Sequence, residues 1–209
     1  KTGRINLAYE CIDKHTEGKL KDKRALVCLR DGSKDIELTF NDLKNYTDQF
    51  SRLLLKNGLS KGDKVLIWLP RIPEFYISLM GVIKAGGIPV PLSEFSSSKL
   101  IMDILENTQG TTYMVTTPLF LNTLQPIPPK LKTIIINEND DFSGGSPWEF
   151  HMKDSLKDAE TTIRWVDFSD GLTAHYSLGC LSKPKPKLTF YKQDLMLLIR
   201  QYGEWVLSL

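Results

Sequence analysis

Residues 58–92 read GLSKGDKVLIWLPRIPEFYISLMGVIKAGGIPVPL, and the order of apolar residues and prolines in this stretch decides the fold class. Its first apolar run, Val65–Leu69, is ended by Pro70. A short continuous apolar run predicts a strand covered on both faces, which is the usual state in a parallel sheet. Pro73 suits the first position of a helix, and Glu74 suits the positive first turn that follows. The stretch therefore predicts a strand followed by a helix, the repeating unit of an α/β fold.

The end of the same stretch predicts a helix stop and an edge segment. Gly86 and Gly87 are expected to end the helix that begins at Pro73. Residues 88–92 are predicted to be extended, but their prolines cannot donate to a sheet ladder. This segment is therefore expected at an edge of the sheet or at the end of a strand.

The residues before this stretch predict a helix with a defined beginning and end. Thr39 and Asp42 have the spacing of a capping box, and Gly58 stands where a left-handed residue ends a helix. Apolar residues between them recur at spacings of three and four, which places them on one helix face. They are Leu43, Tyr46, Phe50, Leu53 and Leu54.

Helices and short apolar strands continue to alternate up to residue 136. A third helix is expected after Ser96–Ser98, and strands are expected at Thr112–Thr116 and Thr133–Ile136. This alternation predicts an α/β fold with a mostly parallel sheet flanked by helices. We divide residues 1–209 into an α/β core (1–136), a polar excursion (137–160) and a region containing a strand, a loop and a helix (161–209).

Composition excludes several classes of protein. The 209 residues are 41% hydrophobic and carry a formal net charge of +2, which is typical of a globular protein and too small a charge for phosphate-driven binding of nucleic acid. The three cysteines form no metal-binding or disulfide pattern, which fits a reducing cytoplasm. No apolar run is long enough to span a membrane, and no signal peptide is recognised.

A basic, proline-spaced stretch follows the strand-forming residues before it. Residues 176–188 read YSLGCLSKPKPKL. A phosphate loop needs small residues that let backbone N–H groups converge, hydroxyl donors and a lysine. The residues that meet these needs in part are Ser177, Gly179, Ser182, Lys183 and Lys185. Neither GxxxxGK[ST] nor GxGxxG occurs, so local chemistry alone favours a solvated, extended loop over a phosphate loop.

The order of residues in this stretch resembles the signature loop of the adenylate-forming acyl-CoA synthetases, usually Tyr-Thr-Ser-Gly-Ser/Thr-Thr-Gly-Lys-Pro-Lys-Gly. The identical positions are Tyr176, Gly179, Lys183, Pro184 and Lys185. Longer segments carry the same resemblance, closest to the bacterial acetyl-CoA synthetases: INLAYECIDKH (5–15), residues 58–92, WVDFSDGLTAHYS (165–177) and QYGEWVLSL (201–209). The chain is identified as a member of this family over essentially its whole length.

The resemblance implies a ligase that works in two half-reactions. ATP and a carboxylate, here acetate, give an acyl-adenylate and pyrophosphate, and the thiol of CoA then gives the thioester and AMP. Mg²⁺ and the signature loop would steady the phosphates. The ATP phosphate loop implied for this chain comprises Ser177, Gly179, Cys180, Ser182, Lys183 and Lys185. No residue of the chain is assigned as catalytic or as a metal ligand.

The loop departs from the family pattern at the positions that hold phosphate. Leu178, Cys180, Leu181 and Ser182 replace family serine, threonine and glycine residues, and Pro186 replaces the final glycine. Each donor lost next to a developing negative charge typically costs about 3 kcal/mol of transition-state stabilisation. The family's carboxylate pocket, adenine-binding segment and catalytic lysine have no counterpart up to Leu209. We therefore expect an N-terminal fragment that is inactive as this chain alone.

Two alternatives stay open beside the ligase fragment. The chain could serve as a non-catalytic nucleotide- or partner-binding module derived from the family. An incomplete sheet also exposes an edge and an apolar face, which favours homo-oligomers. The divergence over residues 178–200 fits either a decayed gene copy or an error in the sequence.

Other candidate residues are expected to be structural. His175 is expected to be a hydrogen-bonded structural histidine, and Cys180 lacks the base that a nucleophile needs. Arg71 and Glu74 are expected to form a turn and a first-turn charge rather than a substrate contact. The lysines at 183, 185, 187 and 192 are expected to form a solvated edge, with polyanion binding as the alternative.

Overall fold

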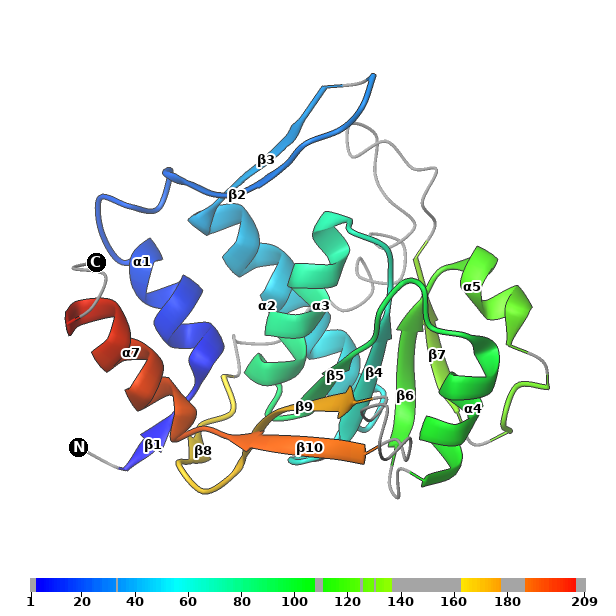
Figure 1. Ribbon diagram of the computed structural model, residues 1–209. Helices are drawn as coiled ribbons and strands as arrows, with labels where there is room; N and C mark the ends of the chain where they lie inside the picture. Colours follow the sequence, from blue (N-terminus) through cyan, green and yellow to red (C-terminus); the bar gives the residue numbers. More distant parts are fainter. Residues whose placement is uncertain are drawn as a thin grey trace.

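The computed structural model describes residues 3–136 apart from 33, 108–110, 125 and 130, together with residues 163–177 and 187–205 (Figure 1). The first half contains β1 (Arg4–Ile5), the π-helix η1 (Tyr9–Asp13), α1 (Lys14–Thr16), β2 (Arg24–Cys28), β3 (Ile36–Thr39), α2 (Phe40–Lys56), β4 (Lys64–Trp68), α3 (Pro73–Lys84) and β5 (Ile88–Pro91). The second half contains α4 (Ser98–Asn107), β6 (Thr111–Thr116), α5 (Pro118–Thr123), β7 (Lys132–Ile135), β8 (Val166–Asp167), β9 (Gly171–Ser177), β10 (Lys187–Lys192) and α7 (Leu195–Trp205).

A four-stranded parallel sheet forms the centre of the described fold, with the strand order β5-β4-β6-β7. The expected α/β class with a parallel sheet is thereby confirmed. β5 lies at an edge, as its prolines predicted, because each proline removes one N–H from the ladder. The chain runs from β4 to β5 on one side and then returns to β6 on the other side of β4.

Two apolar cores cover the two faces of this sheet. Val65 and Ile67 of β4 are fully buried in a core shared with α2 and α3, while Leu66 and Trp68 face a second core shared with α4. Figure 1 shows α2 and α3 on one side of the sheet and α4 and α5 on the other. Burial of both faces is the reason why β4 shows no alternation of polar and apolar residues.

The ends of the helices follow the local signals in the sequence. The hydroxyl of Thr39 accepts a hydrogen bond from the N–H of Asp42 (3.1 Å), and the Asp42 carboxylate accepts one from the N–H of Thr39 (2.9 Å). This is the expected capping box of α2. Gly58 and Gly86 follow α2 and α3 with φ of 88° and 79°, a left-handed conformation that L side chains rarely adopt.

The structure also contains elements that the sequence did not indicate. β2 and β3 form an antiparallel hairpin, α5 follows β6, and the two-residue strands β1 and β8 pair across most of the chain length. β10 pairs with β9 in a hairpin where only a strand, a loop and a helix were expected. Among the described residues, no helix is long and apolar enough to cross a membrane.

A buried ion-pair network joins η1, α2 and α3. The Lys84 side chain is 1% exposed, and its Nζ lies 2.8 Å from Asp13 Oδ2 and 2.7 Å from Asp48 Oδ1. It also donates to the Thr47 hydroxyl at 3.0 Å. Lys44 Nζ reaches the other oxygen of Asp48 at 2.7 Å. Three segments of the chain therefore share one buried ammonium group.

Candidate functional site

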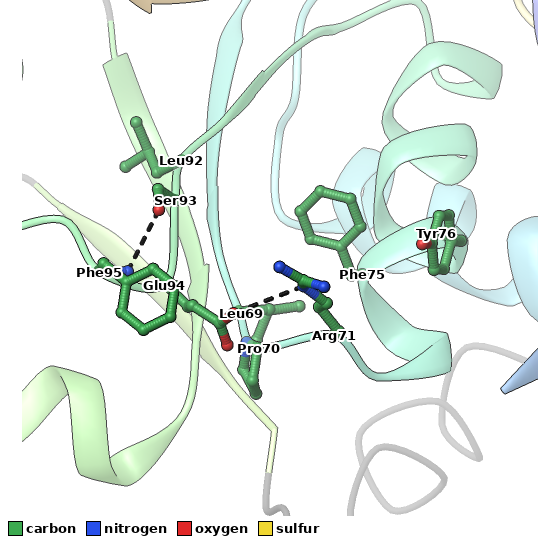
Figure 2. A pocket seen from close by; sticks show the side chains of 9 residues that line it. All are labelled: Leu69, Pro70, Arg71, Phe75, Tyr76, Leu92, Ser93, Glu94 and Phe95. Carbon is green, nitrogen blue, oxygen red and sulfur yellow. Dashed lines mark hydrogen bonds and ion pairs between the residues drawn. The ribbon is translucent and has the colours of Figure 1, made fainter. Parts of the chain in front are cut away.

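An open pocket of about 510 Å³ lies at the carboxyl ends of β4 and β5 (Figure 2). Ligands of open α/β sheets commonly bind outside the carboxyl ends of the strands. The pocket is lined by residues of the loops that leave the two strands and of the first turn of α3: Leu69, Pro70, Arg71, Phe75, Tyr76, Leu92, Ser93, Glu94 and Phe95.

Local sequence explains why these side chains gather there. Pro70 ends β4, and the Ile72 N–H donates to the Pro70 carbonyl (2.9 Å), which forms a tight turn before Pro73 begins α3. After β5, the Phe95 N–H donates to the Ser93 hydroxyl at 3.2 Å. These two turns place Arg71 and Phe95 on either side of the opening (Figure 2).

The charges of the pocket form one exposed pair. Arg71 Nε lies 3.5 Å from Glu94 Oε1, and the Arg71 side chain is 87% exposed. A pair this exposed contributes little to stability. Arg71 occupies the turn that was expected of it, since the Ile72 N–H donates to the Pro70 carbonyl around it, and this turn also forms part of the pocket wall.

Glu74 occupies the structural position expected of it. It lies in the first turn of α3, and its side chain is buried. Burial raises the pKa of this carboxyl, while its own backbone N–H and the nearby Arg30 oppose the rise. The sequence did not single out Tyr76, Glu94 or Phe95, although the rule for the carboxyl ends of parallel strands could have found them.

The pocket combines apolar surface with a few polar and charged groups. Three aromatic rings provide apolar surface, and Arg71 and Glu94 provide one charge of each sign. No histidine, cysteine or lysine is among the lining residues. Within the described ranges, no group of three His, Cys, Asp or Glu side chains could hold a metal ion.

The residues of the predicted phosphate loop connect β9 to β10 in the sequence. Ser177 ends β9 and pairs with Lys187, the first residue of β10. Of the predicted site residues, Gly179, Cys180, Ser182, Lys183 and Lys185 lie outside the described residues, as does Pro186. The structure therefore describes the two strands that carry the loop, and not the loop itself.

The hairpin is anchored on the second core and on the edge of the parallel sheet. Ala174 is fully buried in the core shared with α4, and Tyr176 and Leu188 pack against that core. The Thr173 hydroxyl donates to the Pro89 carbonyl of β5 at 3.0 Å. The Lys64 ammonium lies 5.6 Å from the centre of the Phe190 ring, so β10 also contacts β4.

Residues close to the loop have structural partners. Burial, and to a lesser extent the charge of Asp103, raise the pKa of the Tyr176 phenol. His175 Nε2 lies 3.5 Å from the Thr173 hydroxyl, and the His175 ring meets the Tyr191 ring edge to face across the hairpin. These contacts are those of a structural histidine, as the sequence indicated.

Comparison with known proteins finds a matching family and relatives of similar sequence. The model of a family described as AMP-binding enzyme matches residues 13–189. The chain is 34% identical to acetyl-coenzyme A synthetase of Bacillus subtilis over 211 residues, covering 100% of this chain and 36% of that protein. It is 27% identical to acetyl-coenzyme A synthetase of Methanothrix soehngenii, covering 88% of this chain and 30% of that protein.

A solved structure shares the fold. Acyl-CoA synthetase of Brucella canis superposes with a TM-score of 0.78 at 24% sequence identity, over 96% of this chain and 36% of that one. The present chain thus spans about a third of the length of the proteins that it matches.

Proposed function

The chain belongs to the AMP-binding enzymes, and on this premise we propose that it forms the ATP-binding N-terminal part of an acetate-activating ligase. The overall reaction would convert ATP, acetate and CoA into acetyl-CoA, AMP and pyrophosphate. The proposal divides the chain as the sequence suggested, into a core (1–136), a polar excursion (137–160) and the region that carries the loop (161–209).

This proposal rests on one observation. The β9–β10 hairpin is fixed close to the loop by the apolar contacts of Ala174, Tyr176 and Leu188, and residues 178–186 connect its two strands. A loop closed between paired residues loses less conformational entropy when it binds a ligand. This arrangement supports a role for Ser177, Gly179, Cys180, Ser182, Lys183 and Lys185 in holding the ATP phosphates.

We further propose that this chain alone does not complete the reaction. The loop has lost most of the hydroxyl donors of its family, so pyrophosphate would leave with little stabilisation. CoA, ATP and Mg²⁺ belong to the chemistry of the family, and we assign no described side chain to Mg²⁺. The alternative is a nucleotide-binding module without catalysis, which the lost hydroxyl donors of the loop favour.

Two assays test the proposal. Calorimetric titration with ATP in the presence of Mg²⁺ is expected to show saturable binding, and Lys183→Ala/Lys185→Ala is expected to weaken it about tenfold through the lost phosphate contacts. Lys192→Ala is the matched control, because this exposed lysine lies on β10 outside the loop and its removal should leave the affinity unchanged.

The second assay is acetate-dependent exchange of labelled pyrophosphate into ATP. Binding without exchange supports the module without catalysis, whereas exchange by the purified chain would contradict the expected inactivity. A flat ATP titration would remove the nucleotide role. An equal loss of affinity in Lys192→Ala would indicate a diffuse basic surface instead of a loop.

A further inference from the structure

The Asn6 side chain joins three segments that are far apart in the sequence. Asn6 is fully buried, and its Nδ2 donates to the Ile83 carbonyl at 2.9 Å and to the Arg164 carbonyl at 3.0 Å. Its Oδ1 accepts from the Ala8 N–H at 3.0 Å and from the Tyr9 N–H at 3.4 Å. All donors and acceptors of the amide are therefore used, which fixes its orientation.

The two carbonyls that Asn6 contacts belong to different structural units. Ile83 lies in the last turn of α3, and its carbonyl accepts from the Gly86 N–H at 3.0 Å as well as from Asn6. Arg164 belongs to the segment that precedes β8, and its own N–H donates to the carbonyl of Lys84 at 3.0 Å. Asn6 thus holds this segment against the end of α3.

Further contacts hold the same segment. Ile5 and Arg4 pair with Val166 and Asp167 of β8, and the Tyr9 ring lies 5.1 Å from the Trp165 ring. The N-terminal residues 4–9 therefore contact β8 and the two residues before it. We call residues 4–9 the N-terminal strap.

β8 leads directly into the hairpin that carries the predicted loop. The Asp170 N–H donates to the Asp167 carbonyl (3.0 Å) in the turn after β8. The residue after β10 returns to this turn, since the Gln193 N–H donates to the Asp170 carbonyl at 3.0 Å and the Gln193 side-chain amide donates to the Gly171 carbonyl at 3.1 Å. β9 therefore begins, and β10 ends, next to the turn that follows β8.

We propose that Asn6 is a positioning residue for the β9–β10 hairpin. It acts through Arg164: the buried amide fixes where the residues that enter β8 lie against the end of α3, and this fixes the base from which the hairpin extends. Loss of the amide would leave the Arg164 carbonyl without this donor in a partly buried place, while the Ile83 carbonyl keeps the Gly86 N–H, so the segment before β8 is the part that should open locally. Only the expected effect of Asn6 on ATP affinity rests on the proposed function; the positioning of the hairpin does not.

Hydrogen–deuterium exchange tests the positioning role without any ligand. Asn6→Asp keeps the size and the acceptor of the side chain but loses both amide donors. We expect it to raise exchange at residues 163–177 and 187–192 about tenfold more than at β4 and β6. Asn6→Ala should do the same. Leu53→Ala is the control, because Leu53 lies in the α2–α3 core. This substitution should raise exchange only in proportion to the loss of global stability.

If the Asn6 variants do not fold, a milder variant takes their place in the exchange experiment. Tyr9→Ala removes the ring contact with Trp165 from a half-buried position and should raise exchange in the same segments to a smaller extent. Unchanged exchange at residues 163–177 in the folded variants would overturn the proposal. The same pattern in Leu53→Ala would also overturn it.

Calorimetry with ATP separates the two proposals. If the wild-type chain binds ATP, Asn6→Asp should weaken the affinity about fivefold to tenfold while Leu53→Ala leaves it unchanged. An unchanged affinity in Asn6→Asp would refute the coupling to the loop. If the wild-type chain does not bind ATP, the nucleotide role fails and the exchange experiment alone decides the role of Asn6.

Discussion

Replacing Lys84 by methionine should destabilise the protein strongly. The side chain is 1% exposed and supplies the counter-charge for Asp13 at 2.8 Å and for Asp48 at 2.7 Å. Methionine keeps much of the volume and removes the charge. Removal of one partner of a buried ion pair typically costs about 3 to 5 kcal/mol, because the remaining charge stays desolvated.

The expected loss of stability in Lys84→Met comes mainly from Asp13. Asp48 keeps a second cation, since Lys44 Nζ lies 2.7 Å from its other oxygen. Asp13 Oδ2 has no hydrogen-bond partner among the described residues, although Lys84 Nζ lies 2.8 Å away as an ion-pair partner. The double variant Lys84→Met/Asp13→Asn should therefore recover part of the loss, with a coupling energy of about 1 to 3 kcal/mol.

Urea denaturation followed by circular dichroism measures the free energy of unfolding. Lys44→Met is the matched control, because it removes the same kind of side chain from a position that is 28% exposed. A partly exposed pair contributes about 0 to 1 kcal/mol, so this control should remain close to the wild type. Equal losses in the Lys84 and Lys44 variants, or a Lys84→Met loss below about 1 kcal/mol, would refute the reasoning.

The pH dependence of the stability loss in Lys84→Met gives a second test. Burial raises the pKa of Asp13, and the charge of Lys84 opposes that rise. A carboxyl with a raised pKa binds its proton more tightly in the folded state, so its unfavourable burial is relieved as the pH falls through the folded pKa. Without Lys84 the rise should be larger. The deficit of Lys84→Met should therefore shrink as the pH is lowered from neutral, and a constant deficit would contradict this account.

Two further substitutions test local features of the fold. Thr39→Ala removes the capping box of α2 and should lower the free energy of unfolding by about 0.5 to 2 kcal/mol in the same urea experiment. Thr39→Ser keeps the hydroxyl and should retain most of the wild-type stability. Gly81→Ala places a Cβ 2.7 Å from Phe50 Cδ1 between α2 and α3, and should cost about 1 to 3 kcal/mol through overpacking. Gly18→Ala meets no atom within 4 Å and should be close to neutral; a neutral Gly81→Ala would contradict the close packing of these helices.

The candidate sites differ in how far sequence could predict them. The resemblance identified the loop through Gly179 and Lys183, which lie outside the described residues, so its phosphate contacts stay a prediction. The aromatic pocket was missed because Tyr76 and Phe95 lie on different segments and show no periodicity. Only the parallel pairing of β4 and β5 brings the two carboxyl ends together.

Sequence by itself determined the fold class and the local elements around β4, although it did not indicate the β2–β3 hairpin or β10. The run Val65–Leu69, the prolines at 70 and 73 and the capping box at Thr39 act within a few residues, so their effect can be predicted without tertiary contacts. The tertiary structure decided the contacts between distant segments. Asn6 meets a carbonyl 158 residues away, and Lys84 meets Asp13 across 71 residues. Such partners depend on how the helices and strands pack, because a polar residue in the sequence carries no sign of which distant group will satisfy it when buried.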